Sequence, residues 1–318
     1  KDACKAGKCV GVEPDACLAG ALPCQVASCN PLTGGCTAQM ADDGVACAGG
    51  EGQCAAGICV QTGSHDRKLV HVPAGSFWMG CNALTDTACA TSSDENPQHE
   101  VVLSAYWLDM HEVTVADYAV CHEAGECATP SVGDGFNWGV ADHEDHPVNG
   151  VDWFKSRKYC QWLGSGYDLA TEAQWEKAAR GGCEHNGGDA ECKVEMRTYP
   201  WGSPPAPTCE FAIMDDKGPG CGADSTWPVG SKPKGASPYG ALDMTGNVWE
   251  WTLDWYDPAY YEVSPKEDPF QGVGQFKRVY RGGGQANSPV SLRSGERSGT
   301  NPTASYPFIG FRCATSTP

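Results

Sequence analysis

The stretch Asp243-Met244-Thr245-Gly246-Asn247-Val248-Trp249-Glu250-Trp251 carries more structural information than any other part of this chain. It places one glycine, four oxygen-bearing side chains and two indoles within nine residues. A loop that turns at Gly246 can aim two carboxylates and several backbone carbonyls at one point, and hard cations such as Ca²⁺ bind about six to eight such oxygens. The stretch is therefore a candidate cation site, although such a run taken alone is more often an ordinary loop beside a strand. We expect its indoles to pack in the core.

The composition indicates an oxidising, extracytoplasmic setting. Nineteen cysteines in 318 residues is far above cytosolic usage, because thiols are kept reduced in the cytosol. The formal net charge of −18 argues against nucleic acid and anionic membrane surfaces as partners. No apolar run approaches the roughly 20 residues of a membrane span, so we expect no membrane insertion within this chain.

Residues 1–62 hold nine cysteines and almost no large apolar side chains, so disulfides must hold this segment together. The cysteine spacing repeats in two triplets, Cys17, Cys24 and Cys29, then Cys47, Cys54 and Cys59. Cys4 and Cys9 match only the second half of a triplet, so we expect that Lys1 is not the natural start and that more repeats lie upstream. We predict a disulfide-rich stalk over residues 1–62, a linker over 63–68 and a large domain over 69–318.

Local patterns predict the main elements of the large domain. Thr114 and Asp152 are each placed to cap a helix, and Thr171-Glu172-Ala173-Gln174 resembles a capping box. The apolar and aromatic run over residues 101–110 predicts one strand.

The ten cysteines after residue 68 are even in number, which suits complete pairing. Four pairs close in sequence would each close a short surface loop: Cys81–Cys89, Cys121–Cys127, Cys183–Cys192 and Cys209–Cys221. Cys160 and Cys313 remain. Spacing alone does not establish the connectivity.

A series of short motifs runs through the large domain in a fixed order. They include Val72-Pro73-Ala74-Gly75, Glu112-Val113-Thr114, His146-Pro147-Val148, Thr171-Glu172-Ala173-Gln174-Trp175-Glu176, Tyr199-Pro200-Trp201-Gly202, Asn247-Val248-Trp249-Glu250-Trp251, Arg281-Gly282-Gly283 and Gly310-Phe311-Arg312-Cys313. Together, over about 240 residues, they resemble the formylglycine-generating enzyme (sulfatase-modifying factor) family. The resemblance implies an α+β domain with a C-type-lectin-like fold and much irregular loop, beside the small disulfide-rich module. It also implies a Cys160–Cys313 disulfide.

The resemblance also implies calcium ligands. Carried over by position, these are the side chains of Asp243 and Glu250 and the carbonyls of Gly246 and Val248, with Asn247 close enough to contribute. The family's other calcium site falls near residues 209–223, where we expect a Cys209–Cys221 bridge in place of the ion. We therefore predict one bound Ca²⁺.

The family includes two catalytic chemistries, one based on copper and one on iron, and the sequence can be compared with the metal ligands of each. Its oxidases bind copper through two cysteines, and here the matching positions hold Asn287 and Leu292, which cannot bind soft Cu(I). We therefore predict that copper and formylglycine generation are absent. A second branch uses non-haem iron held by histidines of an extra domain. Iron is not expected, but a facial triad remains an alternative. Its candidate histidines are His99, His111, His143 and His146.

The leading interpretation is a non-catalytic secreted or cell-surface protein, with a calcium-stabilised domain on a stalk. We expect a protein or glycan ligand, or self-association into filaments or a surface layer. The face that would contact such a partner is predicted to present Gln285, Asn287, Arg293, Glu296 and Arg297. The alternative is an iron-dependent oxidoreductase of the same superfamily.

Overall fold

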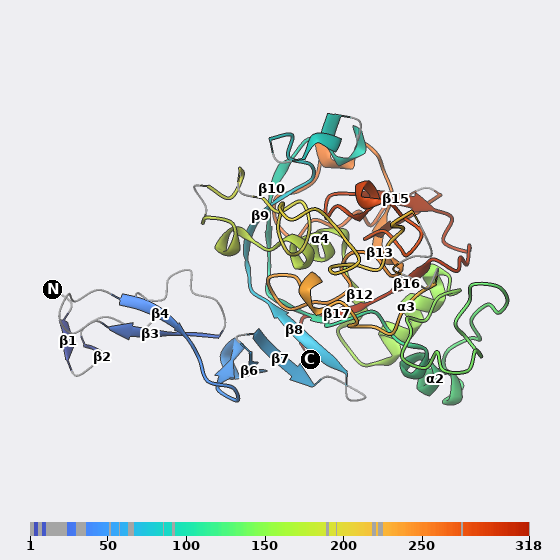
Figure 1. Ribbon diagram of the computed structural model, residues 1–318, viewed down its shortest axis with the longest axis horizontal. Coiled ribbons are helices and arrows are strands. Elements are labelled where there is room, and N and C mark those ends of the chain that lie inside the picture. The colour runs from blue at the N-terminus through green and yellow to red at the C-terminus, as the bar shows by residue number, and fades with distance from the viewer. Residues whose placement is uncertain are drawn as a thin grey trace. The chain divides into compact units, whose positions relative to one another are not determined.

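The chain divides into two compact units, Lys1–Gln61 and Thr62–Pro318 (Figure 1). The structure is a computed structural model and describes residues 3–5, 8–10, 24–29, 36–50, 52–56, 58–62, 67–84, 86–90, 93–188, 191–194, 196–217, 221, 225–274 and 276–317. Each unit is described by itself below.

The N-terminal unit is built from short antiparallel strands. These are β1 (Ala3–Lys5), β2 (Lys8–Val10), β3 (Gln25–Cys29), β4 (Cys36–Met40), β5 (Ala46–Cys47), β6 (Gly52–Ala55) and β7 (Ile58–Thr62). Strand β1 pairs with β2, β3 with β4, and β6 with both β5 and β7. Cys47 bonds to Cys59 within one triplet, and Cys54 bonds back to Cys24. Cys17 lies outside the described residues.

The second unit combines three described α-helices with ten short strands. The helices are α2 (Val115–Glu123), α3 (Trp153–Trp162) and α4 (Glu172–Arg180). The strands are β8 (Lys68–Val72), β9 (Gly75–Met79), β10 (His99–Leu103), β11 (Tyr106–Asp109), β12 (Tyr167–Leu169), β13 (Trp249–Trp255), β14 (Arg278–Arg281), β15 (Arg297–Thr300), β16 (Ile309–Phe311) and β17 (Cys313–Thr315). Short 3₁₀ turns occupy Thr87–Ala90, Ser93–Glu95, Cys183–His185, Pro233–Gly235, Tyr260–Glu262 and Pro289–Leu292.

The strands of this unit form three groups. One has the order β12-β17-β11-β8, the second is the β9–β10 pair, and the third has the order β15-β14-β13-β16. In the third group β13 runs parallel to β16, so Glu250 lies opposite Gly310. Helix α4 contacts both the β9–β10 pair and the β13–β14 pair, and Figure 1 shows it at the centre of the unit.

All three helices begin where the sequence predicts, because the caps are local. Thr114 accepts a hydrogen bond from the Asp117 amide, Asp152 accepts one from the Lys155 amide, and Thr171 forms a capping box with Gln174. Each cap satisfies backbone donors of the first turn that have no partner within the helix. No helix in the described ranges is long and apolar enough to cross a membrane.

Two sequence predictions need correction. Residues 101–110 form two strands instead of one, because β10 pairs with β9 whereas β11 pairs with β8 and β17. Of the linker expected over 63–68, residues 63–66 lie outside the described residues. The other two belong to the domain, since Arg67 is buried in an ion pair with Asp109 and Lys68 begins β8.

Aromatic rings and disulfides brace the core. The rings of Tyr118 and Phe311 both pack against Tyr159, with centroids 5.5 Å apart in each case. Cys160 on α3 bonds to Cys313 on β17, and both are fully buried. The four short-range pairs are also disulfides: Cys81–Cys89, Cys121–Cys127, Cys183–Cys192 and Cys209–Cys221. The last strand, β17, is therefore tied covalently to helix α3.

Candidate functional site

The loop before β13 is tightly curled. Asp243, Gly246 and Asn247 all have positive φ angles, of 54°, 85° and 59°. A Cβ on Gly246 would lie 2.3 Å from the carbonyl oxygen of Ile213, so only glycine fits there. The Asn247 side chain accepts a hydrogen bond from the Trp227 amide, and one Asp243 oxygen accepts one from the Gly230 amide. These bonds fix the loop to a segment that lies 13 to 20 residues earlier in the chain.

Glu250, on β13, is held by a buried arginine. Its two oxygens accept hydrogen bonds of 2.7 Å each from Nη2 and Nε of Arg312, and Oε2 also accepts one of 2.8 Å from the Trp175 indole. Arg312 donates its remaining N–H groups to the carbonyls of Asp109, Met110 and Leu242. What remains available for a cation on Glu250 is the second lone pair of Oε1.

Glu112 is a third carboxylate at this place, and the sequence did not single it out as a ligand. It is fully buried, and its Oε1 has no hydrogen-bond partner. Its Oε2 accepts a hydrogen bond of 3.4 Å from Nδ2 of the Asn247 side chain. Burial, then the charges of Asp243 and Glu250, raise the pKa of Glu112 well above its usual range. Burial also raises the pKa of Asp243.

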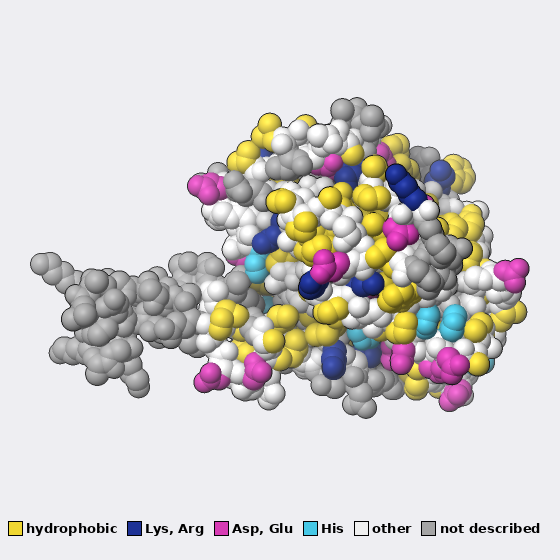
Figure 2. Space-filling model, in the orientation of Figure 1, with side chains coloured by type: hydrophobic (Ala, Val, Ile, Leu, Met, Phe, Trp, Pro, Cys, Tyr) yellow, Lys and Arg dark blue, Asp and Glu magenta, His cyan; other side chains and the backbone are white. Residues whose placement is uncertain are grey.

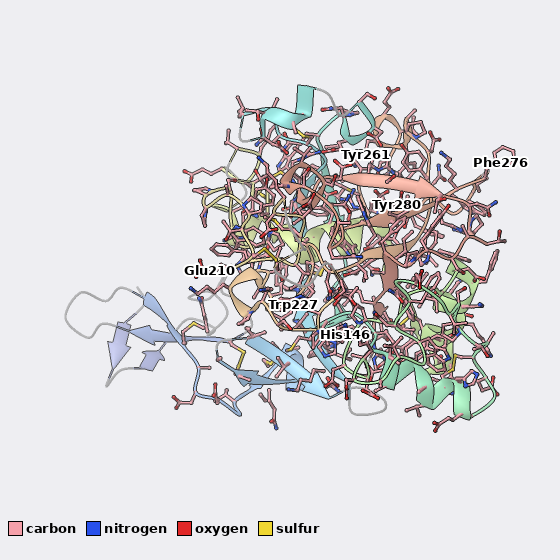
Figure 3. The ribbon with its side chains drawn as sticks, turned by 45° about the vertical axis from the view of Figure 1, so that its right-hand side comes forward. His146, Glu210, Trp227, Tyr261, Phe276 and Tyr280 are labelled. Carbon is pink, nitrogen blue, oxygen red and sulfur yellow. A yellow bond between two sulfur atoms is a disulfide. The ribbon has the colours of Figure 1, made fainter. Side chains whose placement is uncertain are left out.

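Two further positions, Asn287 and Leu292, are those that the resemblance assigns to copper ligands. Asn287 Oδ1 accepts hydrogen bonds from the Trp249 indole at 2.8 Å and from the Gly284 amide at 3.0 Å. Trp249 in turn packs edge-on against Tyr280, which Figure 3 labels, with ring centroids 4.9 Å apart. Leu292 is fully buried against Ala212 and Met214. One position is therefore a fixed amide and the other an alkyl group in the core.

The sulfatase-modifying factor enzyme 1-like domain model matches residues 59–317. The chain belongs to this family. The sulfatase-modifying factor domain is 33% identical over 269 residues to the serine/threonine-protein kinase pkn1 of Chlamydia caviae, covering 78% of this chain but 38% of that protein. It is 28% identical to mouse formylglycine-generating enzyme, covering 78% of this chain and 74% of the enzyme.

Solved structures show the same fold. PvdO from Pseudomonas aeruginosa superposes with a TM-score of 0.65 at 25% identity, over 81% of this chain and 97% of PvdO. The α+β, C-type-lectin-like fold expected of the sulfatase-modifying factor domain is therefore confirmed. Since the chain spans only about 38% of the kinase-named relative, the activity and partners of that protein are not carried over.

The residues around the loop fit a calcium ion. Glu112, Asp243 and Glu250 are three buried carboxylates, and among the described residues only Arg312 forms a salt bridge with any of them. The buried Glu112 Oε1 has no hydrogen-bond partner and needs a proton or a cation. These carboxylates do not bring three ligand oxygens within 4.8 Å of one another. Backbone carbonyls such as those of Gly246 and Val248 would therefore supply part of the coordination.

The predicted ligand face of the domain needs correction. Arg293 and Arg297 are 2% and 3% exposed, so neither can be presented to a partner. Arg293 is held by Glu95 at 2.7 Å, and Arg297 by Glu172 at 2.7 Å. Both arginines look solvent-facing in the sequence because Glu95 and Glu172, which hold them in the interior, are more than 100 residues away. Gln285, Asn287 and Glu296 remain partly exposed.

Glu296 predicts a pH dependence of stability. Burial, then the charge of Glu95, raise the pKa of Glu296 to about 7 and outweigh the opposing effect of Arg293. From pH 4.5 to 7 the unfolded chain is ionised at this residue while the folded one keeps its proton, so its contribution to stability falls as pH rises. We expect Glu296→Gln to reduce that fall by on the order of 2 kcal/mol. Urea unfolding at pH 5, 6 and 7 gives the free energy of unfolding of both proteins. An identical change of this free energy with pH in the wild type and the variant would contradict the prediction.

The four candidate histidines do not form an iron triad. His143 and His146 stack with centroids 4.1 Å apart, and their Nδ1 atoms contact Asn137 and Thr226. His99 contacts the Pro97 carbonyl and His111 the Glu112 carbonyl. Within the described ranges, no three His, Asp or Glu ligand atoms free of cysteine lie within 4.8 Å of one another.

Proposed function

We propose that this protein is a non-catalytic binding or structural module of the sulfatase-modifying factor family. The observation that carries the proposal is the chemistry of Asn287 and Leu292. An amide that already accepts two hydrogen bonds and a fully buried alkyl group offer no thiolate for copper. No described cysteine is free to replace them, since those in the structure are paired.

We also propose an extracellular or cell-surface location, which the disulfides support. The second unit has five disulfides, four of which close loops of 6 to 12 residues. Disulfides of this density form and persist in oxidising compartments. The visible face in Figure 2 shows Lys and Arg scattered singly rather than gathered into a patch, which supports the exclusion of nucleic acid as a partner.

The partner surface is narrower than the sequence suggested. Ala286, Ser288 and Val290 are exposed and Gln285 and Asn287 half-buried, so the segment 285–290 stays available at the surface. The buried residues Gly284 and Leu292 fix this segment at both ends. A protein or glycan ligand, or a second copy of the chain, would bind there. One calcium ion would hold the adjoining loop of residues 243–248 in place.

The proposal predicts that the protein does not generate formylglycine. Incubated with copper, air and a cysteine-containing sulfatase peptide, it should give no aldehyde above the background without enzyme, because no thiol pair is present to bind the metal. Mass spectrometry of the peptide measures the product. Mouse formylglycine-generating enzyme is the positive control. Aldehyde formed in repeated turnovers would refute the non-catalytic reading.

A further inference from the structure

A cavity of about 460 Å³ opens on the side of the domain that carries the Cys183–Cys192 loop. The residues of its wall that matter here are His185, Asn186, Glu191, Met196, Arg197 and Ser203. The volume is within the range of small-molecule sites in proteins. None of the residues 284–297 lines it, so it is separate from the segment proposed above to bind a partner.

Arg197 in this cavity lacks the partner that the other arginines have. Seven of the nine arginines of the chain pair with a carboxylate, and Arg278 lies between the rings of Trp153 and Trp255. In the described part of the chain Arg197 has neither. Its one hydrogen bond, to the Arg180 carbonyl, is 3.5 Å long. The Arg197 side chain is half-buried, and this burial lowers its pKa.

His185 lies beside Arg197 and also lacks a partner. Its Nε2 is buried with no hydrogen bond. Burial, then the charges of Arg197 and Lys177, lower the pKa of His185 to about 4, so the ring is neutral near pH 7. Both residues converge on Gly181, since a Cβ there would meet Arg197 Nη1 at 3.0 Å and the His185 Cβ at 3.1 Å. A neutral imidazole and a guanidinium therefore share one wall.

The wall around these two groups is rigid. The Cys183–Cys192 disulfide closes the loop that contains His185. The Asn186 side chain donates hydrogen bonds to the carbonyls of Gly181 and Gly182 at 3.1 and 2.9 Å. The His185 ring packs edge-on against Tyr239, with centroids 4.8 Å apart. The side chains are thus held in place before any ligand arrives, which reduces the entropy cost of binding.

We propose that this cavity binds a small polar ligand that carries a carboxylate, with Arg197 as its bidentate partner and His185 as an additional hydrogen-bond donor. Guanidinium and carboxylate match in shape and charge, and a desolvated pair of this kind binds more strongly than a neutral one. Glu191, exposed on the rim, would favour a ligand that also has an amine. The proposal does not depend on whether the positions of Asn287 and Leu292 support catalysis.

Isothermal titration calorimetry on the full chain tests this. The probes are sodium D-glucuronate as a sugar acid, L-glutamate as an amino acid, and D-glucose as the neutral control, at constant ionic strength. We expect one acid or both to bind in the millimolar range or tighter and glucose not to bind. Tighter binding of glutamate would assign a role to Glu191, and tighter binding of glucuronate would assign the site to sugars.

Two variants assign the binding to the cavity. Arg197→Gln should weaken binding of the acid by about tenfold or more. Arg197→Lys keeps the charge but loses the two parallel hydrogen bonds of the guanidinium, so it should weaken binding by less. Arg157→Gln, which removes a partly exposed arginine paired with Asp168, should leave binding unchanged. Unchanged melting temperatures confirm folding. Lack of binding of both acids to the wild type, or equal binding to Arg197→Gln, would overturn the proposal.

Discussion

Replacing Arg312 by methionine should lower the free energy of unfolding by about 3–5 kcal/mol. Arg312 is 1% exposed and makes two 2.7 Å hydrogen bonds to Glu250. Methionine keeps much of the volume, but it leaves Glu250 buried beside Glu112 and Asp243 with no arginine to balance the three carboxylates. Urea unfolding at pH 7 measures the loss. The loss should shrink at low pH, where protons neutralise the carboxylates.

The matched control is Arg157→Met. Arg157 also makes a bidentate pair, with Asp168, but their side chains are 37% and 28% exposed. Water screens such pairs, so we expect a change below about 1 kcal/mol. If Arg312→Met cost as little as Arg157→Met, the loop before β13 would not depend on a buried ion pair, and the electrostatic description of this site would be wrong.

The second large effect concerns the Cys160–Cys313 disulfide. The two residues are 153 apart in sequence, and closing so long a loop in the unfolded chain removes about 5 kcal/mol of denatured-state entropy. The double variant Cys160→Ala/Cys313→Ala should therefore lose about that much stability. Denaturant unfolding under non-reducing conditions gives the value.

Cys121→Ala/Cys127→Ala is the control for this experiment. This bridge spans only 6 residues, so the same chain-entropy relation predicts a loss of about 2 kcal/mol. Equal losses for the two double variants would show that loop length does not decide the stabilisation. The order of the two values therefore tests whether the long bridge ties the last strand to the body of the domain.

Features set by neighbouring residues could be predicted from the sequence. The caps at Thr114, Asp152 and Thr171 are bonds to amides three residues ahead, so their spacing is visible in the chain. The break between β10 and β11 was missed because residues 101–110 form one nearly continuous apolar and aromatic run, and only their different pairing partners separate the two strands.

The candidate site was predicted in part for the same reason. The loop of Asp243 to Glu250 is continuous in sequence and could therefore be singled out, and its binding of calcium stays a prediction. Glu112 was missed because it meets Asn247 across 135 residues. The burial of Arg297 could not be foreseen either, since its partner Glu172 is 125 residues away. Buried charges paired over such distances leave no local pattern.

Elemental analysis of the purified native protein by mass spectrometry tests the central claim most directly. The account predicts about one calcium per chain and no copper or iron, with calcium lost in Asp243→Ala and kept in the exposed control Asp134→Ala. Stoichiometric iron or copper, or the absence of calcium in the wild type, would contradict it.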